Sequence, residues 1–354
     1  MDFDFYQKKT VLITGHTGFK GTWMAKVLRM HGANVIGYAM EPPTEPAIFS
    51  LLSMERQMTS VIGDIRDLDH LNQVFGQYRP EIVIHMAAQP IVRESYRNPV
   101  ATYGTNVMGT VHVLEAVRQC DAVKSVINVT TDKVYLNREW EWGYRENDAL
   151  DGYDPYSNSK SCSELVTSSY QKSFFSNGKP AISTCRAGNV IGGGDFARDR
   201  IIPDCVRAMQ EGRKIIVRNP YSTRPYQHVL EPVCAYLELA KRQYLEPEKY
   251  AGSYNIGPDD CDCVTTGALA GLFCDAWGQG ALWEDVSEKN APHEAGFLKL
   301  DCSKIKKTMS WHPKWHISDA VHYSVAWSKV FLDGGDLSAE TEREILQYLS
   351  QEGA

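Results

Sequence analysis

A glycine-rich stretch near the N-terminus constrains the fold more than any other part of the chain. It reads VLITGHTGFKG from Val11 to Gly21, and the amphipathic run Trp23 to Leu28 follows it. The pattern predicts a short buried strand, a tight turn and the start of a helix. Its glycines (Gly15, Gly18 and Gly21) allow the tight turn, let backbone N–H groups approach a pyrophosphate and let the helix pack closely on the sheet. Because a helix N-terminus attracts negative charge, the stretch predicts dinucleotide binding rather than a purely structural turn.

Apolar runs alternate with helical stretches after this turn. Strands are predicted at residues 34–39, 58–62, 82–86, 125–129 and 181–186, and helices at 68–76, at 99–118 and from Pro155 onward. Parallel neighbouring strands need crossover connections, so this alternation predicts an α/β fold with a doubly wound, parallel, Rossmann-type sheet. A ligand is expected at the carboxyl ends of the strands.

The composition of the sequence changes after residue 188, where glycine, proline and arginine become frequent. We therefore expect a smaller C-terminal substrate-binding domain made of residues 189–228 and about 258–354. The dinucleotide-binding domain is expected to comprise residues 1–188 and about 229–257, since residues 229–257 read as a helix and a strand that return to the sheet.

Composition excludes several classes of function. The 354 residues carry 37 Lys and Arg against 44 Asp and Glu, a net charge of −7, which gives no reason to bind nucleic acid or an acidic membrane. The charged, aromatic N-terminus does not resemble a secretory signal, and no apolar run approaches the roughly 18 residues of a membrane span. A cytoplasmic protein is expected. The nine cysteines show no CxxC spacing, and Cys261 and Cys263 lack His or Cys partners nearby in sequence, so no metal is expected.

Tyr156 and Lys160 are the strongest catalytic candidates. They lie four residues apart at the start of a predicted helix and therefore on one helix face. A phenol is a poor base at neutral pH, but a nearby ammonium and a cationic cofactor ring would lower its pKa. Thr131 follows the strand 125–129 and would share a substrate hydroxyl with Tyr156. The alternative is a purely structural role, with Tyr156 and Lys160 as ordinary helix residues and Thr131 bonded to the backbone at a strand end.

Asp132 and Lys133 stand directly after Thr131. An acid beside a potential base suits chemistry beyond hydride transfer, namely removal of one proton and protonation of a leaving hydroxyl. The alternative is an exposed ion pair. Four arginines of the second region (Arg198, Arg200, Arg218 and Arg224) offer charge-assisted, bidentate bonds to a sugar-nucleotide diphosphate, although each alone reads as a surface residue.

The order of these motifs resembles the extended class of short-chain dehydrogenases/reductases that act on nucleotide sugars. Dehydratases of that class carry Thr-Asp-Glu where this chain has Thr131-Asp132-Lys133. That departure is similar to the CDP-glucose 4,6-dehydratases, as are the motifs at 15–23, 88–93, 186–195 and 223–232. The resemblance covers essentially the whole chain.

The resemblance implies NAD as cofactor and CDP-glucose as substrate. The implied cofactor-binding residues are Gly15, Thr17, Gly18, Phe19, Lys20, Gly21, Asp64, Ile65, Ala87, Ala88, Gln89, Asn106, Tyr156 and Lys160. The implied substrate-binding residues are Arg93, Ser95, Asn189, Arg198, Arg200, Arg218, Arg224, Gln227 and His293. The second strand ends in Tyr38-Ala39-Met40 without the acidic residue that usually holds the adenine ribose, and with no Arg or Lys for a 2′-phosphate, so NAD is favoured over NADP.

The implied reaction is redox-neutral. Tyr156, Thr131 and Lys160 would oxidise C4, Asp132 would protonate the C6 hydroxyl, and hydride would return to C6 to give CDP-4-keto-6-deoxyglucose for deoxysugar or O-antigen-type lipopolysaccharide synthesis. Lys133 would take the C5 proton, or would only stabilise the enolate. A nucleotide-sugar 4-epimerase and a non-catalytic NAD-binding scaffold stay as alternatives. A homo-oligomer is implied, with the helices near 102–117 and 156–174 packed across a two-fold axis.

Overall fold

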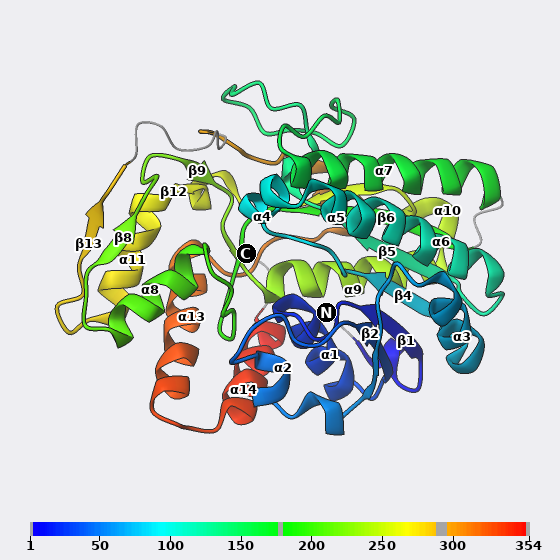
Figure 1. Cartoon of the computed structure of the whole chain (residues 1–354), viewed down its shortest axis with the longest axis horizontal. Coiled ribbons are helices and arrows are strands. Elements are labelled where there is room, and N and C mark those ends of the chain that lie inside the picture. The colour runs from blue at the N-terminus through cyan, green and yellow to red at the C-terminus, as the bar shows by residue number, and fades with distance from the viewer. Residues whose placement is uncertain (1–2, 176–179, 288–295, 352–354) are drawn as a thin grey trace.

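A seven-stranded parallel sheet forms the centre of the molecule (Figure 1). The computed structural model describes residues 3–175, 180–287 and 296–351. The strand order is β11-β6-β5-β4-β1-β2-β3, which confirms the predicted doubly wound sheet. The strands are β1 (Thr10–Thr14), β2 (Asn34–Ala39), β3 (Thr59–Ile62), β4 (Ile82–His85), β5 (Ser125–Val129), β6 (Ala181–Ala187) and β11 (Ser253–Ile256).

The strand order reverses at β1, which pairs with β2 on one side and with β4 on the other. Crossovers leave this point in opposite directions, so the loops after β1 and β4 diverge and open a crevice at the carboxyl ends of the strands. The glycine-rich turn lies at this point, as the sequence predicts.

Helices cover both faces of the sheet. One face packs against α1 (Phe19–Met30) and α9 (Leu230–Leu245), and the other packs against α3 (Leu68–Tyr78), α6 (Gly109–Gln119) and α7 (Pro155–Phe174). Strands β1, β4 and β5 are buried at nearly every position because apolar helix faces meet them on both sides. Shorter helices complete this half: α2 (Ile48–Leu51), α4 (Val92–Arg97), α5 (Pro99–Tyr103) and α10 (Pro247–Tyr250).

The helix predicted over 99–118 is continuous but not uniform. A π-helical turn at Gly104–Met108 separates α5 from α6. Turns of this kind are common at functional sites. This one carries Asn106, whose side chain is buried.

The second region lies on the left of Figure 1 and has its own hydrophobic cluster. Its elements are β7 (Val190–Ile191), α8 (Ile201–Gln210), β8 (Ile215–Val217), β9 (Thr223–Arg224), β10 (Gln227–His228), β12 (Val264–Thr265), α11 (Thr266–Trp277), β13 (Trp283–Asp285) and α13 (Ile317–Leu332). The strands form three separate pairs: β7 with β10, β9 with β12, and β8 with β13.

The C-terminal segment returns to the dinucleotide-binding half. Residues of α12 (Ser303–Met309) and α14 (Leu337–Ser350) belong to the same hydrophobic cluster as α1 and α9. The Lys26 ammonium on α1 lies 2.6 Å from the Glu342 carboxylate on α14. The domain boundaries stay a prediction, but the C-terminal helices contribute to both cores rather than to the smaller region alone.

Candidate active site

The glycine turn has the shape that the sequence predicts. Gly15 has φ of +81°, and a Cβ atom there would lie 2.8 Å from the Ala87 nitrogen; a Cβ at Gly21 would lie 2.1 Å from the Gly15 oxygen. At Gly18 the nearest atom to a Cβ would be 3.5 Å away. Gly15 and Gly21 are therefore required by packing, whereas Gly18 leaves the N-terminus of α1 open.

This N-terminus is built to receive an anion. Gly18 is the N-cap of α1 and offers no side chain to the first N–H groups. Those groups and the helix dipole suit a pyrophosphate. The residues of the turn therefore fit a bound dinucleotide.

The segment that follows β2 is hydrogen-bonded to the glycine turn. The Thr17 hydroxyl donates to the Met40 carbonyl at 2.9 Å, which ties the glycine turn to the strand end. Asp64, an expected adenine contact, pairs with Arg66, and these hydrogen bonds hold the pKa of the Asp64 carboxyl below its usual value. Ile65 is buried beside Gly109 of α6.

Asn106 fixes the loop that follows β4. Its Oδ1 accepts from the Gln89 backbone N–H at 2.8 Å, and its Nδ2 donates to the Gln89 carbonyl at 3.1 Å and to the Ser159 hydroxyl at 2.9 Å. Ala87 and Ala88 lead into this loop directly after β4. The π-helical turn thereby connects the predicted cofactor loop to α7.

Thr131, Asp132 and Tyr156 meet at the end of β5. The Thr131 hydroxyl donates to Asp132 Oδ1 at 2.9 Å and lies in hydrogen-bonding reach of the Tyr156 hydroxyl. Asp132 Oδ2 is buried, with no hydrogen-bond partner among the described residues. Burial raises the pKa of the Asp132 carboxyl, although the neighbouring Lys133 charge opposes the shift. A protonated carboxyl in this place is suited to act as an acid.

Burial also raises the pKa of Tyr156, to about 12, against the hydrogen bond with Thr131. The side chains of the protein alone therefore keep Tyr156 as a phenol, and the phenolate needs further positive charge nearby. Lys160 lies one helical turn beyond Tyr156 on α7. Burial lowers the pKa of Lys160 to about 8, and its ammonium donates to the Val129 carbonyl at 3.0 Å.

Lys20 points into the same region from the first turn of α1. Burial and the charges of Arg200 and Lys160 lower its pKa to about 7. Phe19 beside it packs against the main cluster and would contact a Cβ placed on Gly192 of the second region. The glycine turn and the second region thus face one another across the site.

The predicted arginines divide into two groups. Arg93 of α4 and Arg218 both approach Asp199, with nitrogen–oxygen distances of 3.9 and 2.8 Å. Arg200 pairs with Asp195 at 3.0 Å, and its charge acts on Tyr156.

The other two predicted substrate-binding arginines, Arg224 and Arg198, differ in burial. Arg224 is buried, and its charge lowers the pKa of Asp132 against the larger effect of burial. Arg198 is exposed. Arg200 and Arg224 thus face the catalytic residues, whereas Arg93 and Arg218 gather around Asp199.

The remaining predicted substrate-binding residues differ in burial and in their hydrogen-bond partners. The Gln227 side chain is buried, and its Nε2 donates to the Ile256 carbonyl. Its Oε1 has no hydrogen-bond partner among the described residues. The backbone N–H of Gln227 donates to the Asn189 carbonyl. Ser95 is buried, and its hydroxyl donates to the Val92 carbonyl within α4. Lys133 is half-buried, and His293 lies outside the described residues.

The fold brings a histidine close to Cys261, one of the two cysteines that look isolated in sequence. Ligand atoms of Cys261, Asp262 and His316 lie within 4.8 Å of one another. The Asp262 carboxylate already accepts from His316 Nδ1 and from the Ile317 backbone N–H, at 2.9 Å each. This contact caps α13, so the cluster has a structural explanation.

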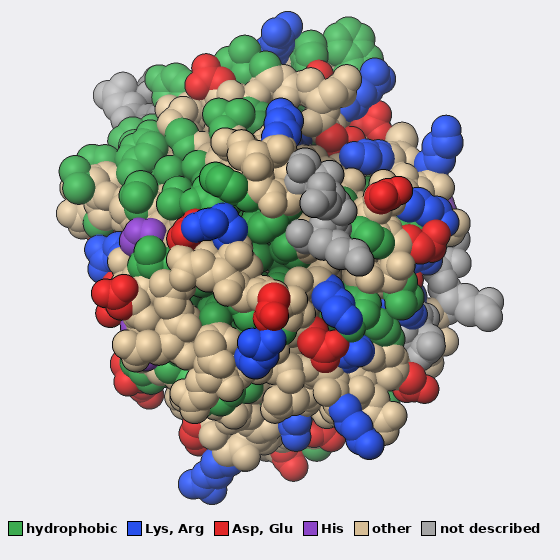
Figure 2. All heavy atoms as spheres, turned by 90° about the vertical axis from the view of Figure 1, so that its right-hand side faces the viewer, with side chains coloured by type: hydrophobic (Ala, Val, Ile, Leu, Met, Phe, Trp, Pro, Cys, Tyr) green, Lys and Arg blue, Asp and Glu red, His purple; other side chains and the backbone are tan. Residues whose placement is uncertain are grey.

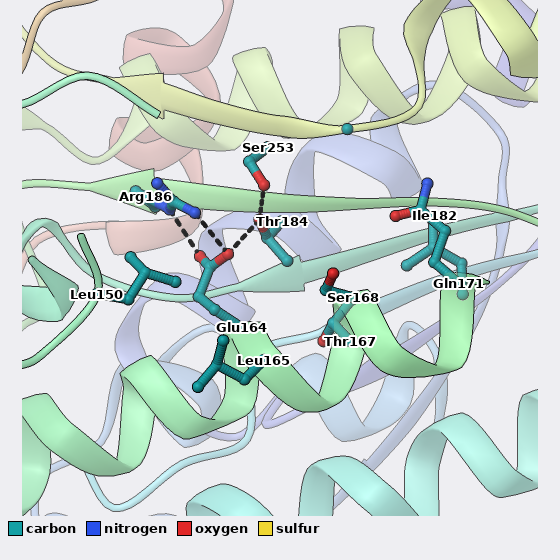
Figure 3. A pocket seen from close by; sticks show the side chains of 11 residues that line it. Leu150, Glu164, Leu165, Thr167, Ser168, Gln171, Ile182, Thr184, Arg186 and Ser253 are labelled. Carbon is teal, nitrogen blue, oxygen red and sulfur yellow. Dashed lines mark hydrogen bonds and ion pairs between the residues drawn. The ribbon is translucent and has the colours of Figure 1, made fainter. Parts of the chain in front are cut away.

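An ion pair that the sequence analysis missed lies one helical turn beyond Lys160. Glu164 of α7 and Arg186 of β6 are buried, with 3% side-chain exposure each, and form two hydrogen bonds of 2.9 Å (Figure 3). The pair borders a cavity of about 160 Å³ that is lined by Leu150, Leu165, Thr184 and Ser253, among others. The spacing Tyr156, Lys160, Glu164 was the available signal, since it extends one helix face by a third position.

Known proteins resemble the chain over nearly its full length. A CDP-glucose 4,6-dehydratase of Salmonella typhimurium is 48% identical over 99% of both chains. In solved structures, a dTDP-glucose 4,6-dehydratase of Bacillus anthracis in complex with NAD has a TM-score of 0.75 and 20% identity, covering 92% of this chain and 98% of that one. A UDP-glucose 4-epimerase of Thermotoga maritima with UDP-glucose has a TM-score of 0.77 and 21% identity, covering 91% and 99%.

The two structural likenesses establish the fold, which dehydratases and epimerases share. The family model described as GDP-mannose 4,6 dehydratase matches residues 12–323. Since this match spans most of the sequence and contains the glycine turn and every catalytic candidate, the chain belongs to the GDP-mannose 4,6 dehydratase family.

Proposed function

We propose that the protein is an NAD-dependent CDP-glucose 4,6-dehydratase, which converts CDP-glucose to CDP-4-keto-6-deoxyglucose. The observation that carries the proposal is the buried Asp132 carboxyl, which has a raised pKa and a free oxygen beside Thr131 and Tyr156. Simple transfer of hydride needs no such acid. Loss of a hydroxyl group does. The 48% identical relative bears the name of this activity.

The first step is oxidation at C4 of the glucose. Bound NAD would supply a hydride acceptor and a positive charge beside Tyr156. Thr131 orients the C4 hydroxyl, and Tyr156 removes its proton as a phenolate. The Lys160 ammonium, fixed on the Val129 carbonyl, stabilises that phenolate.

The second step is elimination of water. A ketone at C4 makes the C5 proton acidic, and we assign its removal to Lys133, which acts as the base in its neutral amine form. Asp132 then donates its proton to the C6 hydroxyl, which leaves as water. Burial of Asp132 supports this role because it favours the protonated carboxyl. C6 would then accept the hydride and C5 would accept a proton, so the overall reaction would be redox-neutral and would leave NAD unchanged.

The substrate would lie between the glycine turn and the second region. Arg200 and Arg224 approach the catalytic residues, and Arg93 and Arg218 offer two further guanidinium groups beyond them. Guanidinium pairs bind diphosphates well. We assign the first two to the sugar side and the other two to the nucleotide side of the substrate.

Mass spectrometry of the purified protein with CDP-glucose and NAD in deuterated water tests the proposal, with UDP-glucose and dTDP-glucose as controls. Loss of one water with one deuterium retained, fastest for CDP-glucose, is expected. An isomer of unchanged mass would instead identify a 4-epimerase. No turnover of any sugar nucleotide, together with full biological activity of Tyr156→Phe, would favour a scaffold.

We propose in addition that the protein forms a homo-oligomer through α6 and α7. Large hydrophobic side chains are exposed on this side of the molecule, and Figure 2 shows hydrophobic groups gathered on part of that face. Exposed hydrophobic residues of α7 are Leu165 and Phe174, with exposed fractions of 57% and 55%, and those of the segment that leads into α6 are Val100 and Met108, with 85% and 48%. Exposed apolar side chains that gather on one face are typical of an interface. Light scattering of Leu165→Glu against the native chain tests it.

A cytoplasmic location fits these proposals. All nine cysteines are free thiols, which is typical of a reducing compartment. None of the described helices is both long and apolar enough to cross a bilayer. Fractionation of cells that produce the protein at native levels tests the location. We place its product in deoxysugar synthesis of the O-antigen type.

A further inference from the structure

The carboxylate of Glu164 accepts four hydrogen bonds in the interior. Arg186 donates to both oxygens at 2.9 Å, the Thr130 hydroxyl donates to Oε1 at 2.5 Å, and the Thr184 hydroxyl donates to Oε2 at 2.6 Å. Figure 3 shows Glu164 reaching from α7 toward Arg186 and Thr184 on β6. A buried carboxylate with every lone pair in use holds its partners in one arrangement.

Thr130 connects this carboxylate to the catalytic groups through the backbone. The residue before it supplies the carbonyl that receives the Lys160 ammonium, and the residue after it is Thr131. The Thr130 backbone N–H donates to the Cys185 carbonyl at 2.8 Å, so this residue is held from both sides. A shift of Thr130 would therefore move two catalytic contacts at once.

Arg186 extends the same network to the loop that follows Lys133. Its Nη1 donates to the Tyr135 hydroxyl at 2.8 Å and to the Glu146 carbonyl at 2.9 Å. The Tyr135 hydroxyl donates in turn to Asn255 of β11 at 2.6 Å. The segment with Thr131, Asp132 and Lys133 is thereby held at its two ends by one ion pair.

We propose that Glu164 and Arg186 are positioning residues for the reaction, and that they act through Thr130 to fix Thr131 and the Val129 carbonyl against Tyr156 and Lys160. Neither residue reaches the reacting atoms. The inference rests on the proposed function for its kinetic consequence. Its structural part, the rigidity of residues 130–134, can be measured without substrate.

The charge of Glu164 also acts on Lys160. It raises the pKa of that ammonium against the larger effect of burial. The other titratable groups coupled to Lys160 come from different elements: Lys20 of α1, whose pKa is lowered to about 7, and His85 of β4, whose pKa is lowered to about 3, in both cases chiefly by burial. Since His85 is neutral, Glu164 is the main group that favours the charged Lys160.

Thr130→Val and Thr184→Val form a matched pair for the test. Both remove one buried hydroxyl from the same carboxylate without changing the shape of the side chain, but only Thr130 adjoins the catalytic residues. We expect Thr130→Val to lower kcat by about tenfold or more with KM within about twofold, because a small misplacement of catalytic groups is costly. Thr130→Ser should restore kcat, and Thr184→Val should retain it.

Amide hydrogen exchange of the ligand-free protein gives a second readout. Exchange at residues 131–134 should accelerate in Thr130→Val and not in Thr184→Val. Equal effects of the two variants on exchange and on kcat would overturn the proposal and leave a purely structural ion pair. If the native protein turns over no sugar nucleotide, the proposed function fails, while the exchange result still decides the positioning role.

Glu164→Gln supplies the electrostatic readout. The loss of the carboxylate lets Lys160 lose its proton at lower pH, so the alkaline limb of the kcat profile should move to lower pH. Thr130→Val, which keeps the charge, should lower the profile without moving this limb. An alkaline limb that stays in place in folded Glu164→Gln would contradict the assigned effect on Lys160.

Discussion

The Asp199 carboxylate lies 2.8 Å from a guanidinium nitrogen of Arg218 and 3.9 Å from one of Arg93. These arginines come from distant parts of the sequence, and an acidic side chain brings them together. All three side chains are between a third and two-fifths exposed, so water and salt weaken the pairing. A diphosphate could therefore replace the carboxylate as their partner.

We expect Asp199→Asn to bind CDP more tightly than the native protein, by about threefold to tenfold, because a competing charge is removed from the two arginines that we assign to the nucleotide side of the substrate. Isothermal titration with CDP measures the difference. Glu211→Gln, which removes the partner of the surface residue Arg213, is the control and should change nothing. Weaker binding by Asp199→Asn would mean that the carboxylate orients the arginines for the substrate.

Asp132→Asn should separate oxidation from elimination. An amide has no proton to give to the C6 hydroxyl, so we expect reduced cofactor to accumulate while dehydration falls by about 10²-fold to 10⁴-fold. A substrate analogue with fluorine at C6 should restore elimination, because fluoride leaves without an acid. Failure of this analogue to react with Asp132→Asn would argue against the acid role.

Lys133→Ala tests the base. We expect C4 oxidation to continue and elimination to stop, because an alanine side chain cannot accept the C5 proton. Absorbance of reduced cofactor in a single turnover measures the first step, and deuterium incorporation at C5 measures the second. Lys172→Ala, on the exposed C-terminal turn of α7, is the control. Dehydration at full rate in Lys133→Ala would remove this residue from the mechanism.

Glu231 links stability to pH. It is buried on α9, where its carboxyl accepts hydrogen bonds from the Trp315 backbone N–H and the Tyr348 hydroxyl, and burial raises its pKa to about 7. The folded state therefore holds a proton that the unfolded state releases near its ordinary pKa of 4.5. This contribution to stability is complete below that value and is lost as pH rises toward about 7.

Glu231→Gln mimics the protonated carboxyl. We expect its Tm to match that of the native protein at pH ~4.5 and to exceed it by several degrees at pH ~8, since each unit of pKa shift is worth about 1.4 kcal/mol. Glu342→Gln, whose carboxylate is half exposed, should show no such dependence. Parallel Tm curves for Glu231→Gln and the native chain would show that the carboxyl titrates normally.

The sequence predicts the parts of this molecule that depend on local patterns. The sheet, the glycine turn and the helix with Tyr156 and Lys160 each follow from spacing within about 20 residues. The two-residue strands β7, β9, β10 and β12 do not, because each exists only through a partner that lies far along the chain. Long-range pairing leaves no periodic signal in so short a segment.

The site shows the same division. Thr131, Asp132 and Tyr156 could be predicted because strand ends and helix starts converge in a doubly wound sheet. The Asp199 carboxylate among the arginines and the pairing of Glu164 with Arg186 could not, since charge partners are chosen by tertiary packing. Ser95 shows the opposite case, because this predicted substrate-binding residue donates its hydroxyl to a carbonyl of its own helix.

The return of α14 to α1 has a consequence for synthesis of the chain. Trp23 near the N-terminus and Tyr348 near the C-terminus belong to one hydrophobic cluster. A nascent chain leaves the ribosome at about 5–20 residues per second, N-terminal part first. The dinucleotide-binding half therefore exposes apolar surface until the last helix emerges. Its core closes only after α14 has left the ribosome, and a chain truncated before α14 should depend on chaperones.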